Sequence, residues 1–108
     1  MGFFKNIARS FTSKIGEVSG SDFNNRFLAK SNKDGLPALV IYMTGTKDYL
    51  FNKNDVKEFN LLESNVFVFK QGDNQYIGSK YRVTFKDGKT AILNVPAGNC
   101  KDVEKVLY

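Results

Sequence analysis

The chain has 108 residues, of which 42% are hydrophobic and 25% are charged, and its formal net charge is +5. This length fits one domain with one modest core, and the composition excludes a disordered or collagen-like chain. The single cysteine excludes an internal disulfide framework, and no stretch approaches the ~20 apolar residues of a membrane-spanning helix. We therefore expect a cytoplasmic protein.

The N-terminal segment predicts a basic amphipathic helix over residues 3–15. Apolar residues recur there at helical spacing, and no acidic residue precedes Glu17. The first 33 residues carry six basic and two acidic side chains, so +4 of the net charge lies there. We expect residues 1–20 to form this helix and its linker. Its candidate contacts with a membrane or partner are Phe3, Phe4, Lys5, Ile7, Arg9, Phe11, Lys14 and Ile15.

The remaining chain, residues 21–108, predicts one β domain. Short apolar or alternating runs separated by polar turns indicate strands. We expect seven of them, at 27–30, 38–44, 49–52, 56–62, 66–70, 81–86 and 91–95. In residues 81–86 the alternation places Tyr81, Val83 and Phe85 on a buried face. This alternation places Tyr81 on the strand face opposite the neighbouring basic residue Arg82.

Two local signals complete the fold prediction. Asp87-Gly88 predicts a tight type I′ hairpin, which needs positive φ at both central residues. After residues 96–98 end the sheet, Asn99 is expected to cap a C-terminal helix with its side chain. The fold class is thus mainly β, as an antiparallel bent barrel or sandwich with a helix at each end.

Strand order and turn chemistry resemble those of bacterial PH-like and GRAM-like domains. The resemblance rests on residues 49–63, which run through Asn54-Asp55-Val56-Lys57-Glu58-Phe59, and on residues 81–107, with their strand, hairpin, strand and helix. It covers residues 26–107. It implies a bent barrel closed at one end by the helix, and a module that binds lipid or protein. The family's phosphoinositide-binding members carry basic residues across the first hairpin. Here residues 38–44 contain no basic residue.

Candidate anion contacts are the basic residues Lys30, Lys33, Lys80 and Arg82. The chain has no histidine, which is the commonest general base and metal ligand. Asp55, Glu58 and Glu63 fit a solvated surface better than an acid/base pair. Cys100, near a helix start, fits a small packed residue better than a reactive thiol. We expect no catalysis, no metal and no cofactor.

These features predict a non-catalytic module that docks a protein partner or an anionic membrane surface, with the basic helix as an accessory element. A peripheral membrane location follows if that helix lies in the interface. Two alternatives stay open. One is a nucleic-acid-binding β-barrel, because tyrosines lie near bases in the sequence. The other is a structural homo-oligomer assembled through the N-terminal helix.

Overall fold

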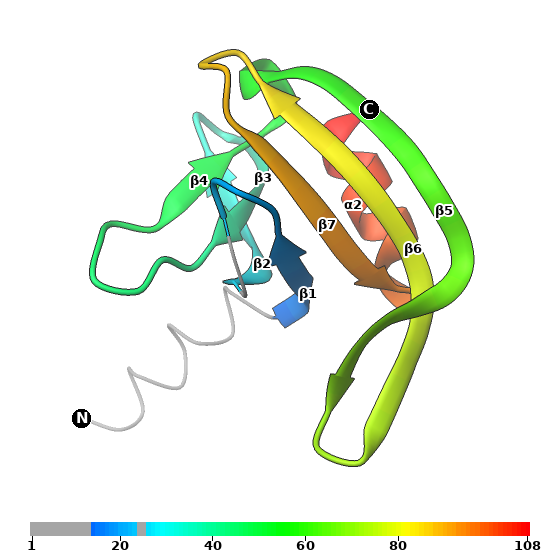
Figure 1. Cartoon of the computed structure of the whole chain (residues 1–108). Helices are drawn as coiled ribbons and strands as arrows, with labels where there is room; N and C mark the ends of the chain where they lie inside the picture. The colour runs from blue at the N-terminus through cyan, green and yellow to red at the C-terminus, as the bar shows by residue number, and fades with distance from the viewer. Residues whose placement is uncertain (1–13, 24–25) are drawn as a thin grey trace.

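The computed structural model describes residues 14–23 and 26–108, which form a single antiparallel sheet and a C-terminal helix (Figure 1). The seven strands pair in the order β4-β3-β2-β1-β7-β6-β5, and the sheet is not closed. The strands are β1 (Lys14–Ser19), β2 (Arg26–Lys33), β3 (Leu36–Ile41), β4 (Tyr49–Phe51), β5 (Val56–Gln71), β6 (Asn74–Phe85) and β7 (Thr90–Pro96). The short helices are η1 (Lys53–Asp55), η2 (Ala97–Asn99) and α2 (Cys100–Leu107).

Strand β1 corrects the prediction of a helix that extends to residue 15. Lys14 and Ile15 begin β1, which pairs with β2 on one side and β7 on the other. Ile15 is buried in the core, and a Cβ at Gly16 would lie 2.5 Å from the carbonyl oxygen of Asn94. Tight packing against β7 therefore fixes this segment as a strand. The rest of the predicted helix, residues 3–13, lies outside the described residues.

The predicted number of strands is right, but several of the strands differ from the prediction. The strand expected at 81–86 begins earlier, because β6 starts at Asn74. The structure adds β1, and it joins the two expected strands at 56–62 and 66–70 into the single strand β5 of 16 residues. Asn65, with a φ of +59°, lies at the point where the sequence suggested a break. Irregular pairing with β6 on both sides of this position absorbs the extra residues as β-bulges. The break that the sequence suggests at this position is therefore a bend within one strand.

The core lies on the inner face of the curled sheet, under α2 (Figure 1). As predicted from their alternation, Tyr81, Val83 and Phe85 are buried, together with the apolar stripe of α2. The Phe51 and Phe85 rings, from β4 and β6, meet edge to face with centroids 4.8 Å apart. This contact brings the two outer parts of the curled sheet together at one end.

The two Asp-Gly turns have different geometries, which corrects the hairpin prediction. Asp34 and Gly35 both have positive φ, at 54° and 78°, and join β2 to β3 as a type I′ turn requires. At Asp87-Gly88 only the glycine has positive φ. There Gly88 N–H donates to Phe85 O at 3.0 Å, and Phe85 N–H donates to Lys89 O at 2.8 Å. This is a three-residue loop with a glycine bulge, which the dipeptide alone does not distinguish from a tight turn.

Asn99 does not cap the C-terminal helix as expected. The single turn η2 precedes α2, and the Asn99 side chain makes no capping hydrogen bond. Its Nδ2 instead donates to the carbonyl oxygen of Ile15 at 3.1 Å. The amide thus ties the start of the helix to β1, and a residue predicted to act locally makes a long-range connection.

Candidate functional site

A hairpin arm projects beyond the rest of the sheet (Figure 1). We define the hairpin arm as residues 66–77, where β5 and β6 pair with each other after β7 has ended at Pro96, opposite Gly78. Phe67 and Ile77 face each other across the arm, and each is 49% exposed. Their position past the end of β7 leaves this apolar pair without the covering that β7 and α2 give to the inner half of β6.

The outer edge of β5 is the second prominent surface. In the described part of the chain β5 pairs only with β6, so its other side is free. Leu61 and Leu62 are 51% and 42% exposed on this strand. A free edge presents unpaired N–H and C=O groups to a further strand. Four register shifts in the pairing with β6 divide this edge into shorter segments, of which 58–61 is the longest regular one.

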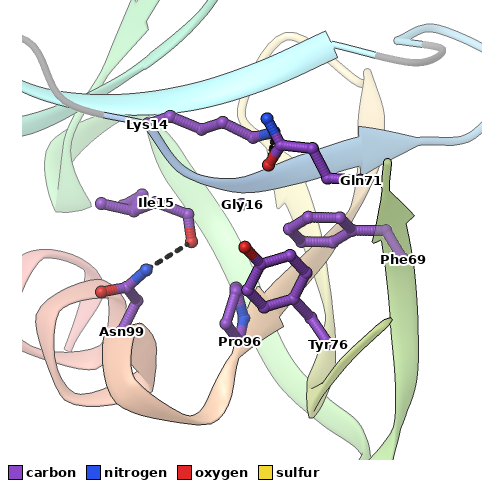
Figure 2. Close-up of a pocket in the computed structure, with 8 residues that line it drawn as sticks. All are labelled: Lys14, Ile15, Gly16, Phe69, Gln71, Tyr76, Pro96 and Asn99. Atoms are coloured by element: carbon purple, nitrogen blue, oxygen red, sulfur yellow. Dashed lines mark hydrogen bonds between the residues drawn. The ribbon is translucent and has the colours of Figure 1, made fainter. Parts of the chain in front are cut away.

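An aromatic pocket lies where the hairpin arm meets the start of β1 (Figure 2). Its cavity has a volume of about 150 Å³. The rings of Phe69, Tyr76 and Pro96 line it together with the Lys14 and Gln71 side chains, and β1 and η2 complete its wall. The Phe69 and Tyr76 centroids lie 4.9 Å apart, and Phe69 is 7% exposed. We call this cavity the arm pocket.

Lys14 places a cation beside the arm pocket. Its Nζ lies 4.0 Å from the Phe27 ring centroid and 5.1 Å from that of Phe69, and it donates to Gln71 Oε1 at 3.0 Å. Burial lowers the pKa of Lys14 below its ordinary value, and the charge of Glu17 opposes this shift. Cation–π contacts of this kind contribute about 0.5–1 kcal/mol each. They compensate only part of the lost hydration of the ammonium group.

The predicted contacts of the N-terminal helix are mostly outside the described residues: Phe3, Phe4, Lys5, Ile7, Arg9 and Phe11. The structure describes Lys14 and Ile15 and separates their roles. Ile15 lies in the core, whereas Lys14 borders the arm pocket.

The four predicted anion contacts do not converge. Lys30 pairs with Asp102 of α2 at 2.9 Å, and Lys33 pairs with Asp55 at 2.8 Å. Lys80 and Arg82 lie on β6, which β1 and β7 separate from the strand of the other two. Two of these bases are therefore already neutralised within the fold.

Asp55 has a structural role at η1. It accepts hydrogen bonds from Lys33 Nζ and from the Asn52 backbone N–H, and it completes a capping box with Asn52. Burial by itself raises the pKa of this carboxyl, but these hydrogen bonds and the nearby Lys33 charge outweigh it and lower the pKa. In the described residues no group of three His, Cys, Asp or Glu could hold a metal ion.

Cys100 and Tyr81 belong to the packing around α2. The thiol lies 3.5 Å from the carbonyl oxygen of Pro96, and the buried Tyr81 hydroxyl donates to Glu104 Oε2 at 2.7 Å. Burial, followed by the Glu104 and Cys100 interactions, raises the pKa of Tyr81. The predicted core position of Tyr81 is confirmed, and its ring is therefore not exposed for base stacking.

A second depression lies on the outer face of β2, β3 and β4. It is broader and more open, with a volume of about 500 Å³, and its lining is Ser31, Val40, Tyr42, Lys47, Asp48 and Leu50. The sequence does not predict a binding site at this combination of residues. Its polar lining combines one amine and one carboxylate, so it has no excess of either charge.

Sequence and structure comparisons do not place the chain in a known group. No protein-family model, no curated protein and no solved structure matches it. No helix in the described part of the chain is long and apolar enough to cross a membrane.

Proposed function

We propose that the protein is a non-catalytic, PH-like docking module that binds an extended segment of a protein partner along the free edge of β5. The architecture supports this proposal. Seven antiparallel strands followed by a helix agree with the element order of the PH-like resemblance. The sheet is open, however, and does not form the barrel that the resemblance implies, so β5 remains an edge. An extended peptide gains main-chain hydrogen bonds when it adds to such an edge. Contacts of its alternate side chains determine where along the edge it binds.

The single observation that carries the proposal is the exposed apolar character of this long edge strand. Leu61 and Phe67 are each about half exposed on β5, and Ile77 extends the same apolar face onto β6. Leu61 pairs directly with Tyr81, which faces inward. Ile77 lies on the same face of β6 by alternation, and Phe67 pairs with Ile77. Exposed apolar side chains concentrated on one element indicate an interaction surface.

The bulges of β5 define what kind of strand can bind. Natural sheets use bulges to prevent unlimited edge-to-edge pairing. The pairing with β6 shifts register at four places along β5, and the longest regular segment that remains is 58–61. This segment suits a short peptide strand, whereas no part of β5 offers the long flat edge that promotes aggregation. The strand is therefore suited to reversible docking.

Selection from a displayed library of random 12-residue peptides tests this function. We expect the selected peptides to carry alternating apolar residues, because one face of the added strand must cover Leu61 or Phe67. Binding should slow hydrogen exchange at β5 amides. For each selected peptide, the variant at the residue that it covers, Leu61→Lys or Phe67→Lys, should weaken binding by at least about tenfold.

Leu36→Lys is the matched control, because Leu36 is 38% exposed but lies in β3. This variant should bind the selected peptides as the unmodified protein does. If the peptides protect amides elsewhere and bind both β5 variants normally, the β5 edge is not the docking surface.

A further inference from the structure

We propose a second site: the arm pocket binds a small carboxylate that carries an apolar or aromatic body. The pocket shares Phe69 and Gln71 with the end of β5, but the rest of its lining comes from β1, β6, β7 and η2 (Figure 2), away from residues 58–61. The ligand class follows from three features of the lining: its charge, its apolar walls and its size.

The charge of the pocket favours an anion. Lys14 is not within salt-bridge distance of any carboxylate in the described residues. The undescribed segments cannot supply one, because residues 1–13 and 24–25 contain neither Asp nor Glu. Lys14 is thus a partly buried cation that forms no direct ion pair, whereas Lys30 and Lys33 each have an acidic partner. The charge of Glu17 acts on Lys14 only from beyond salt-bridge distance. A bound carboxylate would supply a direct counter-charge.

The same lysine excludes another ligand class. Aromatic walls such as those of Phe69 and Tyr76 are typical of pockets that hold quaternary ammonium groups. Here the Lys14 ammonium already lies over the Phe69 ring at 5.1 Å. A second cation in the cavity would be repelled, so the rings are left to contact the uncharged body of an anion.

The walls and the volume define the body of the ligand. Phe69, Tyr76, Pro96 and Ile15 give the cavity an apolar lining. A volume of about 150 Å³ equals that of an engineered cavity that admits benzene. One six-membered ring or a short alkyl chain therefore fits inside, while a longer chain must leave through the opening.

Gln71 adds a donor next to the lysine. Its Oε1 accepts the hydrogen bond from Lys14, so the orientation of the amide is fixed and its Nε2 remains a donor. A carboxylate has two oxygens that accept hydrogen bonds. The Lys14 ammonium and the Gln71 amide can therefore each donate to one end of the same anion.

The probe for this site is 3-phenylpropionate, titrated into the full chain and followed by NMR. We expect a dissociation constant in about the millimolar range, which is usual for so small a ligand. The largest shift changes should occur at Gly16, at residues 69–76 and at Asn99. The alcohol 3-phenylpropanol, which has the same body without the charge, should bind at least about fivefold more weakly. Hexanoate and decanoate in parallel titrations distinguish an aryl body from an alkyl chain.

Lys14→Met and Lys89→Met form a matched pair of variants. Each removes one ammonium group that lies over an aromatic ring, and Lys89 lies over Tyr49 in a different part of the fold. Lys14→Met should weaken binding of the acid at least about fivefold and leave that of the alcohol unchanged, whereas Lys89→Met should change neither. Equal affinity for acid and alcohol, shift changes outside the pocket, or no binding up to about 50 mM would each overturn the proposal. None of these results bears on peptide binding at residues 58–61 of β5.

Discussion

The two halves of β6 show how the same kind of strand can serve two purposes. Residues 78–84 pair with β5 on one side and β7 on the other, and Tyr81 and Val83 are almost completely buried there. In the hairpin arm β6 pairs with β5 alone, and Ile77 is half exposed. Apolar side chains occur in both parts of the strand. The number of neighbouring elements therefore decides which apolar side chains form the core and which remain available for a ligand.

The largest expected difference between the two halves concerns truncation of apolar side chains. Phe85→Ala should lower the free energy of unfolding by about 3–5 kcal/mol, because it empties a fully packed site. Ile77→Ala, in the same strand, should change it by less than about 1 kcal/mol because half of the side chain is already in water. Urea denaturation of both variants measures the two changes in the free energy of unfolding. Similar losses in the two variants would contradict the division of β6.

The junction between the halves offers a sharper test. A Cβ at Gly78 would lie 2.8 Å from the backbone nitrogen of Ala97 and closer still to the carbonyl oxygen of Val95. Backbone atoms cannot rotate away, so Gly78→Ala should cost about 1–3 kcal/mol in thermal or urea unfolding. Gly98→Ala is the control, since a Cβ there meets no atom within 4 Å. A tolerated Gly78→Ala would mean that the root of the arm moves freely relative to β7.

The smallest expected effect is a pH dependence of the free energy of unfolding. It arises at Tyr49, at the end of the sheet opposite the arm. Burial, with the hydrogen bond to Asp87 and its charge, raises the pKa of Tyr49 to about 12. The unfolded chain releases this proton near pH 10, so the stabilisation is fully present below pH 10 and is lost as the pH rises towards 12. Unfolding measured from pH 8 to 11.5 should show this decline. Tyr49→Phe should reduce its slope, and an unchanged slope would contradict the assignment.

The sequence predicted the inner face of the fold well, because alternation is a local property. Tyr81, Val83, Phe85 and the apolar stripe of α2 are buried as their spacing indicates. The turn at residues 71–74 and the strand after Asp87-Gly88 are also where the pattern places them. Each of these features depends on neighbours within a few residues, and a single sequence contains that information.

The same local information failed at β1. Lys14 and Ile15 continue a helical spacing, yet they form a strand because Glu17 pairs with Asn94, 77 positions later. The arm pocket escaped prediction for the same reason. Their spacing predicts Lys14 and Ile15 as contact residues of a helix, but nothing in the sequence joins them to Phe69 and Tyr76. These side chains meet only after the sheet has curled.

The sequence by itself thus determined the β character, the buried faces and the C-terminal helix. Tertiary structure alone decided where strands lose their neighbours: at the outer edge of β5 and at the end of β7. The physical reason is that burial depends on what packs against a side chain, and for β1, β5 and β6 those partners are set by long-range pairing. The same pairing brings a lysine without an acidic partner to the mouth of an aromatic pocket.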